Sequence, residues 1–159
     1  MCKKAFFITL LCLIVTACSN EKNTKDDSTK PTGRVPDYVG TLHFLNEEGE
    51  IISTLRYAKA ETELERNQGL MDVREMPKDA GMVFFFENEE PLSFWMANTP
   101  LPLDIMYVNS DSVIVSIYQN TTPFSDKTLP SFEPAKYVIE TNAGYSINHD
   151  IREGLKVRF

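Results

Sequence analysis

Acidic residues on three separate segments of the chain are the first candidates for chemistry: Glu63 or Glu65, Asp104 and Glu140. Two carboxyl groups with different pKa values can act as general acid and general base, and a facing pair about 5 to 9 Å apart is the arrangement that hydrolyses glycosidic bonds. Sequence spacing does not show whether Asp104 and Glu140 converge. Arg66 and Arg74 are ready ion-pair partners. A structural ion-pair role is therefore the favoured interpretation, and a hydrolase of envelope glycans that uses Asp104 and Glu140 is the alternative.

Asp104 belongs to the stretch FWMANTPLPLDI, residues 94–105, which interrupts an apolar run with an amide, a hydroxyl and a carboxylate. Pro100 and Pro102 cannot donate to a β-ladder, so the chain must leave regular strand pairing there. The polar side chains can then bind backbone groups that the prolines expose, or line a cleft with Trp95 as its aromatic wall. The first interpretation makes Asp104 a structural brace and the second makes it a ligand contact. The sequence slightly favours the brace.

A second polar rim is expected where the segment ETNAG, residues 140–144, leaves its strand, because Asn142 and Gly144 permit a turn there. We expect this rim to meet the first one at one end of the sheet. Substituting Asp104→Asn separates the two interpretations, since it should abolish binding at a solvated site or cost ~1–3 kcal/mol of stability at a buried brace. The candidate ligand-binding or structural cluster is Trp95, Asn98, Thr99, Asp104, Glu140 and Asn142, with Glu63 and Arg66 on the polar face of a predicted helix.

No other pattern in the sequence indicates a catalytic, metal or cofactor site. His43 and His149 lack the spacing of a zinc site, and the chain has neither a glycine-rich phosphate loop nor a G-x-S-x-G elbow. Five of the six methionines could suggest Cu(I) handling, but each has apolar neighbours, which favours core filling. We therefore expect no metal ion and no cofactor.

The N-terminus has the pattern of a bacterial lipoprotein. Lys3 and Lys4 precede an apolar stretch, residues 5–15, that is shorter than the ~20 residues of a membrane-spanning helix. The sequence Val-Thr-Ala-Cys then ends at Cys18 and resembles a lipobox, in which the cysteine becomes the lipidated first residue of the mature protein. We expect a signal peptide over residues 1–17 and a membrane-anchored protein on the extracytoplasmic side of the bacterial cell envelope.

Cysteine usage and composition agree with this assignment. The other cysteines, Cys2 and Cys12, lie in the expected signal peptide, so the mature domain has no thiol for a disulfide, a nucleophile or a metal site. Residues 18–37 are polar and should form a flexible tether to a domain over residues 38–159. The net charge of −7, without a basic cluster, argues against nucleic acid as a partner. The expected partners are the membrane, through the lipid, and a small molecule or envelope component.

The apolar patterns of residues 38–159 predict a mainly β (β-rich α+β) domain, an antiparallel sandwich or partly closed barrel with two short helices. Thr62 and Glu65 form a capping box that starts the first helix, and Gly69 is placed to end it. Asn148 is expected to cap a second helix that stops at Gly154. The expected strands are 41–45, 51–60, 81–87, 91–97, 103–108, 113–118, 136–144 and 155–159, with a turn at 88–90 and an irregular loop at 119–134.

A series of short motifs runs in order through this domain: Glu65-Arg66, Gly69-Leu70-Met71, Gly81-Met82, Phe94-Trp95-Met96, Asn98-Thr99, Pro102-Leu103-Asp104-Ile105, Tyr137-Val138 and Asn142-Ala143-Gly144. Together they resemble domain-of-unknown-function family 192. The resemblance implies a compact, barrel-like β domain with few helices, often found in secreted or lipid-anchored proteins, and it implies no activity. Gly154-Leu155 stands where the family usually has Gly-Asp, so any role of that aspartate is absent here.

These patterns predict a lipid-anchored envelope protein whose β domain binds a small ligand or an envelope partner without catalysing a reaction. The glycan hydrolase described above and a purely structural interaction module without a cleft are the alternatives.

Overall fold

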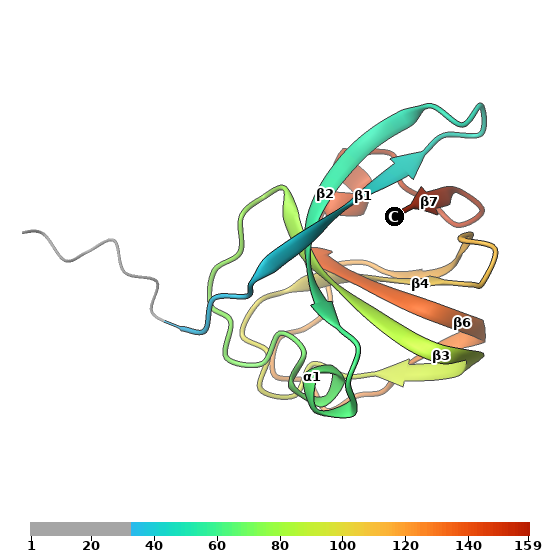
Figure 1. The fold of residues 1–159 in the computed structure, drawn as a ribbon. Helices are drawn as coiled ribbons and strands as arrows, with labels where there is room; N and C mark the ends of the chain where they lie inside the picture. The colour runs from blue at the N-terminus through green and yellow to red at the C-terminus, as the bar shows by residue number, and fades with distance from the viewer. Residues whose placement is uncertain (1–32) are drawn as a thin grey trace, which may run out of the picture. The chain divides into compact units, whose positions relative to one another are not determined.

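The computed structural model describes residues 33–159, and its main element is one seven-stranded mixed β-sheet in the order β5-β4-β6-β3-β2-β1-β7. The sheet curls into a half-barrel, with the β1–β2 hairpin inclined away from β3, β4 and β6 (Figure 1). The mainly β, partly closed barrel with two short helices is thereby confirmed. The elements are β1 (Tyr38–Leu45), β2 (Ile51–Ala60), α1 (Glu63–Gln68), β3 (Ala80–Phe94), β4 (Leu103–Val108), β5 (Ile114–Tyr118), β6 (Leu129–Asn142), α2 (Tyr145–Asn148) and β7 (Lys156–Arg158).

The central strands are buried on both faces because their side chains alternate between two hydrophobic clusters. On β6, Val138 belongs to one cluster and Ile139 to the other. The cluster with Ile139 fills the half-barrel, where side chains of β1, β2 and β7 cover it; we call this side the enclosed face. The opposite side, which carries Val138 and is covered by the segment 70–76, is the pocket face.

One pair of neighbouring strands differs from the antiparallel expectation. Strands β2 and β3 run parallel, with Arg56 opposite Ala80 and Ala60 opposite Phe84. A parallel pair needs a crossover connection, and α1 with the segment 69–79 supplies it. This crossover places α1 over the pocket face of the sheet.

Two predicted interruptions are absent because β3 and β6 pair along most of their length. β3 runs unbroken from Ala80 to Phe94, so the turn predicted at 88–90 is wrong. The exposed acidic residues of this stretch lie instead at an irregularity in the pairing with β6, between Phe85 and Glu90. The loop predicted at 119–134 ends at Leu129, where β6 begins. Proline lacks a donor and normally disfavours a central strand, but Pro130 lies opposite Ser93, next to another register shift.

The second helix also lies earlier than predicted. α2 begins at Tyr145, directly after Gly144 with φ +82°, and Asn148 is its last residue, not its cap. Its start is fixed by a carboxylate that accepts from the backbone amides of Gly144 and Ser146, as described below. A long-range contact of this kind leaves no local sequence signal.

Two residues of the expected tether, Arg34 and Pro36, lie against the domain. Arg34 packs onto the loop after α1, because its Nε and Nη2 donate to the carbonyl of Met71 at 3.2 and 3.1 Å and its amide donates to the carbonyl of Asp72 at 3.1 Å. Pro36 is buried. The signal peptide, Cys18 and the remainder of the expected tether lie outside the described residues. Within residues 33–159, no helix has the length and apolar character to cross a bilayer.

Candidate functional site

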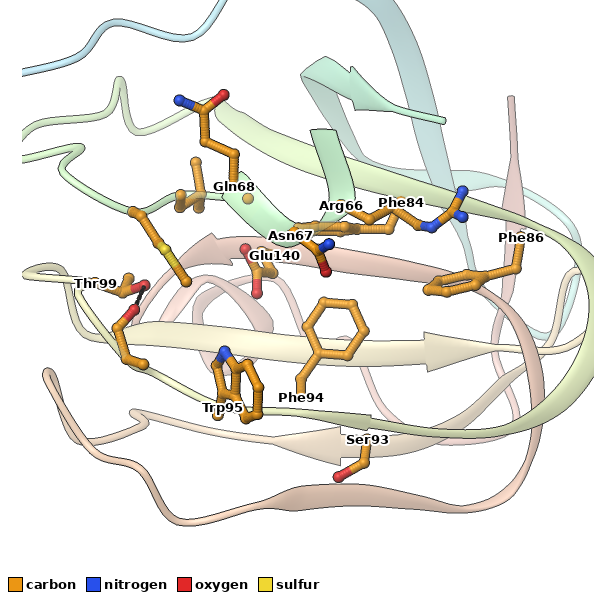
Figure 2. Close-up of a pocket in the computed structure, with 14 residues that line it drawn as sticks. Arg66, Asn67, Gln68, Phe84, Phe86, Ser93, Phe94, Trp95, Thr99 and Glu140 are labelled. Atoms are coloured by element: carbon orange, nitrogen blue, oxygen red, sulfur yellow. Dashed lines mark hydrogen bonds between the residues drawn. The ribbon is translucent and has the colours of Figure 1, made fainter. Parts of the chain in front are cut away.

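A pocket of about 240 Å³ opens on the pocket face, between α1 with the loop that follows it and the end of β3 (Figure 2). Aromatic side chains form much of its wall, and one carboxyl group, from Glu140, lies at its floor. The pocket is lined by Arg66, Asn67, Gln68, Gly69, Leu70, Met71, Phe84, Phe86, Ser93, Phe94, Trp95, Ala97, Thr99 and Glu140.

Local sequence signals hold α1 over this pocket. Thr62 Oγ1 accepts from the amide of Glu65 at 3.2 Å, and Glu65 Oε2 accepts from the amide of Thr62 at 2.9 Å, so the predicted capping box is confirmed. The Thr62 and Glu61 amides lower the pKa of the Glu65 carboxyl. Gly69 then ends the helix at φ +44°, where an added Cβ would lie 3.3 Å from the Phe84 ring. A glycine here lets the chain turn and approach Phe84 closely.

The aromatic wall is built from β3 and is ordered by edge-to-face contacts. The rings of Phe84 and Phe94 have centroids 4.9 Å apart at 90°, and Phe94 meets Tyr107 of β4 at 5.9 Å and 86°. Phe86 contacts Phe94 from the other side at 6.5 Å. Such pairs fix ring positions beyond what area burial alone would do, so the wall is preformed.

Glu140 is the exceptional group of the pocket. Its residue is only 4 % exposed, its carboxyl group opens onto the pocket, and no described residue forms an ion pair with it. Figure 2 shows the carboxyl group pointing into the pocket. Burial raises its pKa from 4.5 to about 8, because a low dielectric disfavours the charged form. The group is therefore mostly protonated at pH 7 in the empty pocket.

The charged and titratable neighbours of Glu140 do not neutralise it. Arg66 lies at the rim, where its Nη1 donates to the carbonyls of Phe85, at 3.1 Å, and of Glu61, and its guanidinium lies 5.0 Å from the centre of the Phe86 ring. Tyr107, on β4, donates its hydroxyl to the carbonyl of Leu129, and burial followed by the Glu140 charge raises its pKa. Arg66 is thus committed to backbone oxygens.

The residues predicted from the sequence divide into those that line the pocket and those that do not. Trp95 is 56 % exposed at the pocket edge, while its neighbour Met96 is buried. Both follow the end of β3 at Phe94, so the strand predicted to run to residue 97 ends earlier. Thr99 also lines the pocket, and its hydroxyl donates to the carbonyl of Ala97 at 3.3 Å. Asn98 is exposed with φ +54° and lies outside the lining, as does Glu63 in the first turn of α1.

Asp104 is buried on the enclosed face, and four donors saturate its carboxylate. Oδ1 accepts from the amides of Asn120 at 2.9 Å and Gly144 at 3.1 Å. Oδ2 accepts from the amide of Ser146 at 2.9 Å and from its hydroxyl at 2.7 Å. This carboxylate joins β4, the chain after β5 and the start of α2, which is the geometry of a brace.

Asn142 also holds parts of the backbone together. Its Nδ2 donates to the carbonyls of Met76 at 3.2 Å and Pro77 at 2.9 Å, and so it ties the end of β6 to the crossover segment. The side chain does not line the pocket.

The sheet register separates the two carboxylates of the hydrolase alternative. Glu140 lies opposite Ile105 and Met82, whereas Asp104 lies opposite Thr141. Cross-strand partners point to the same face and neighbours along a strand to opposite faces, so Glu140 and Asp104 project from opposite sides of the sheet. They do not form the facing pair that glycoside hydrolysis requires. Among residues 33–159, no group of three His, Cys, Asp or Glu side chains is arranged to hold a metal ion.

Sequence reasoning missed most of the pocket wall. Phe84, Phe86 and Phe94 read as core residues, and Asn67 and Gln68 read as an ordinary helix surface. One signal was available: the apolar run 82–86 contains three consecutive phenylalanines, of which only Phe84 is fully buried.

Comparisons with known proteins agree on the fold. The model of DUF192, described as "Uncharacterized ACR", matches residues 43–159. The crystal structure of a proposed transcription regulator from Sinorhizobium meliloti 1021 has a TM-score of 0.73 at 35% sequence identity, covering 79% of this chain and 97% of that one. A protein of unknown function from Novosphingobium aromaticivorans DSM 12444 has a TM-score of 0.71 at 28% identity, covering 79% of this chain and 94% of that one. No curated protein matches the chain.

Proposed function

The chain belongs to DUF192, and because that family's description names no activity, we propose a function from the pocket itself: the domain binds a small molecule without transforming it. We further propose that a lipid on Cys18 holds the domain at the extracytoplasmic surface of the bacterial cell envelope. The V-T-A-C ending of a charged, short apolar segment supports the anchor.

The observation that carries the binding proposal is the Glu140 carboxyl group, which opens onto an aromatic pocket from a nearly buried residue and forms no ion pair with a described residue. Burying a carboxyl group without hydrogen bonds costs free energy that folding alone does not recover. A perturbed titratable group in a concave, largely apolar site is the usual form of a ligand site. A bound ligand would supply the missing partner.

Binding without chemistry fits the groups that reach the cavity. Acid–base chemistry normally needs a second titratable group within reach of the first, and the other charged residue of the lining, Arg66, is held by backbone carbonyls. The Sinorhizobium relative is described as a transcription regulator, but this chain's net charge of −7 does not favour direct contact with nucleic acid.

The test compares two tryptophan substitutions on α1 in residues 19–159, which retain every described residue and lack the lipid. Asn67 points into the pocket (Figure 2), so Asn67→Trp should fill the pocket. Leu64 is exposed on α1 and does not line the pocket, so Leu64→Trp is the matched control. Each protein is incubated with the small-molecule fraction of a cell-envelope extract and examined by native mass spectrometry.

We expect a bound mass on the wild type and on Leu64→Trp that Asn67→Trp loses. Equal retention of the ligand by Asn67→Trp, or no bound mass on any of the three proteins, overturns the proposed function.

A further inference from the structure

We propose that the ligand of this pocket is an organic ammonium ion, with Glu140 as its counter-ion and the phenylalanine and tryptophan rings as its walls. This inference rests on the proposed binding function and names the ligand class.

The charge of the pocket floor selects the sign of the ligand. The Glu140 carboxyl group opens onto the pocket and has no ion-pair partner among the described residues, and burial is the cause of its raised pKa. An anion placed beside it would meet a like charge or keep it protonated, whereas an ammonium group supplies the opposite charge that a buried carboxylate needs. Because the site is desolvated, this pairing is stronger than it would be in water.

The walls suit a cation with a methyl or methylene surface. Phe84, Phe94 and Trp95 line the same space, and aromatic faces attract cations within about 6 Å of the ring centre. One ring of the pocket already makes a cation–π contact, since the Arg66 guanidinium lies 5.0 Å from the centre of the Phe86 ring. Arg66 remains at the rim because carbonyl oxygens hold it, so the floor around Glu140 is left for a smaller cation.

A neutral polyhydroxylated ligand fits the lining less well. Such a molecule needs several convergent hydrogen-bonding groups. The Thr99 hydroxyl is engaged with the carbonyl of Ala97, and Asn67 and Gln68 are exposed residues at the mouth. Glu140 is the main polar group at the floor of the pocket. A single carboxylate surrounded by aromatic rings is an arrangement that binds ammonium ions.

The experiment measures binding of three cations, methylammonium, butylammonium and choline, to residues 19–159 by calorimetry. Each is compared with a neutral analogue of similar shape, such as 3,3-dimethylbutan-1-ol for choline. At least one cation should bind ten times more tightly than its analogue or better, and Asn67→Trp should abolish that binding. In Glu140→Gln the preference should disappear, whereas Glu63→Gln, which removes an exposed charge on α1 outside the pocket lining, should retain it.

The pH dependence gives an independent readout, because choline itself does not titrate. The groups that face Glu140 are Arg66 from α1 and Tyr107 from β4, while its strand neighbours Met82 and Ile105 are uncharged. Arginine keeps its charge throughout this range, and burial keeps Tyr107 protonated. A cation that needs ionised Glu140, whose pKa is about 8, should therefore bind about tenfold more tightly at pH 9 than at pH 7.

A neutral analogue that binds as tightly as its cation, or affinity that falls as pH rises, overturns the ammonium inference. So does failure of every cation to bind. None of these results touches the proposed function, which fails only if the envelope extract yields no ligand sensitive to Asn67→Trp.

Discussion

Replacing Glu140 with glutamine should stabilise the domain, and by an amount that grows with pH. Burial raises the pKa of this carboxyl group from 4.5 to about 8. A group with a raised folded-state pKa contributes its stability while it is protonated, and that stability is lost as pH rises from the unfolded pKa through the folded one. The wild type should therefore lose stability between about pH 4.5 and 8, whereas glutamine has no proton to lose.

The size of the effect follows from the same shift. Each pH unit across this window costs about 1.4 kcal/mol for one proton that the unfolded state releases and the folded state keeps. Between pH 5 and pH 7.5 the difference between Glu140→Gln and the wild type should grow by about 3 kcal/mol. The free energy of unfolding, from urea titrations at several pH values, measures it directly.

A constant difference across this range would refute the reasoning. It would mean that Glu140 ionises as easily in the folded domain as in the unfolded chain, so that water or a partner reaches it. Glu63→Gln is the matched control, because it removes an exposed carboxyl group on α1.

Three further predictions concern the brace, the N-terminal segment and the anchor. Asp104→Asn should lower the free energy of unfolding by about 2–4 kcal/mol, because an amide NH₂ group would face the Ser146 amide and leave buried donors without an acceptor; unchanged urea titrations would contradict the brace. A chain that starts at Tyr38 should be less stable than one that starts at Gly33 by about 1–2 kcal/mol, because it lacks the Arg34 hydrogen bonds; equal melting temperatures would show that these bonds contribute nothing. Cys18→Ala should move the full-length protein from the detergent phase to the aqueous phase in a phase-partition assay; retention in the detergent phase would exclude the lipid anchor.

The local features of the fold could be predicted because their causes lie within a few residues. The capping box of Thr62 and Glu65 and the helix end at Gly69 are short-range signals. The β4–β5 hairpin was predicted for the same reason, since Asn109 accepts from the amides of Asp111 and Val113 within its own turn.

The features that could not be predicted depend on contacts between distant segments. The parallel pairing of β2 and β3, the unbroken β3 and the early start of α2 are set by partner strands and by Asp104. The residues of the candidate site also depend on contacts between distant segments. Asp104 and Glu140 looked equivalent in the sequence, but the register of β6 sends their side chains to opposite faces.

The short strand β7 has a consequence for how the protein avoids self-association. β7 (Lys156–Arg158) is the last strand of the sheet and pairs with β1. The backbone at its start also bonds to the start of β5, the strand at the other end of the sheet: Val113 lies opposite Lys156, and the amide of Ile114 donates to the carbonyl of Leu155 at 2.9 Å. Unpaired edge strands are templates for addition of another chain. This short segment therefore pairs with backbone groups at both ends of the sheet. Its proteolytic removal would leave the N–H and C=O groups of β1 and of the start of β5 unpaired, which would favour strand-to-strand aggregation of the domain.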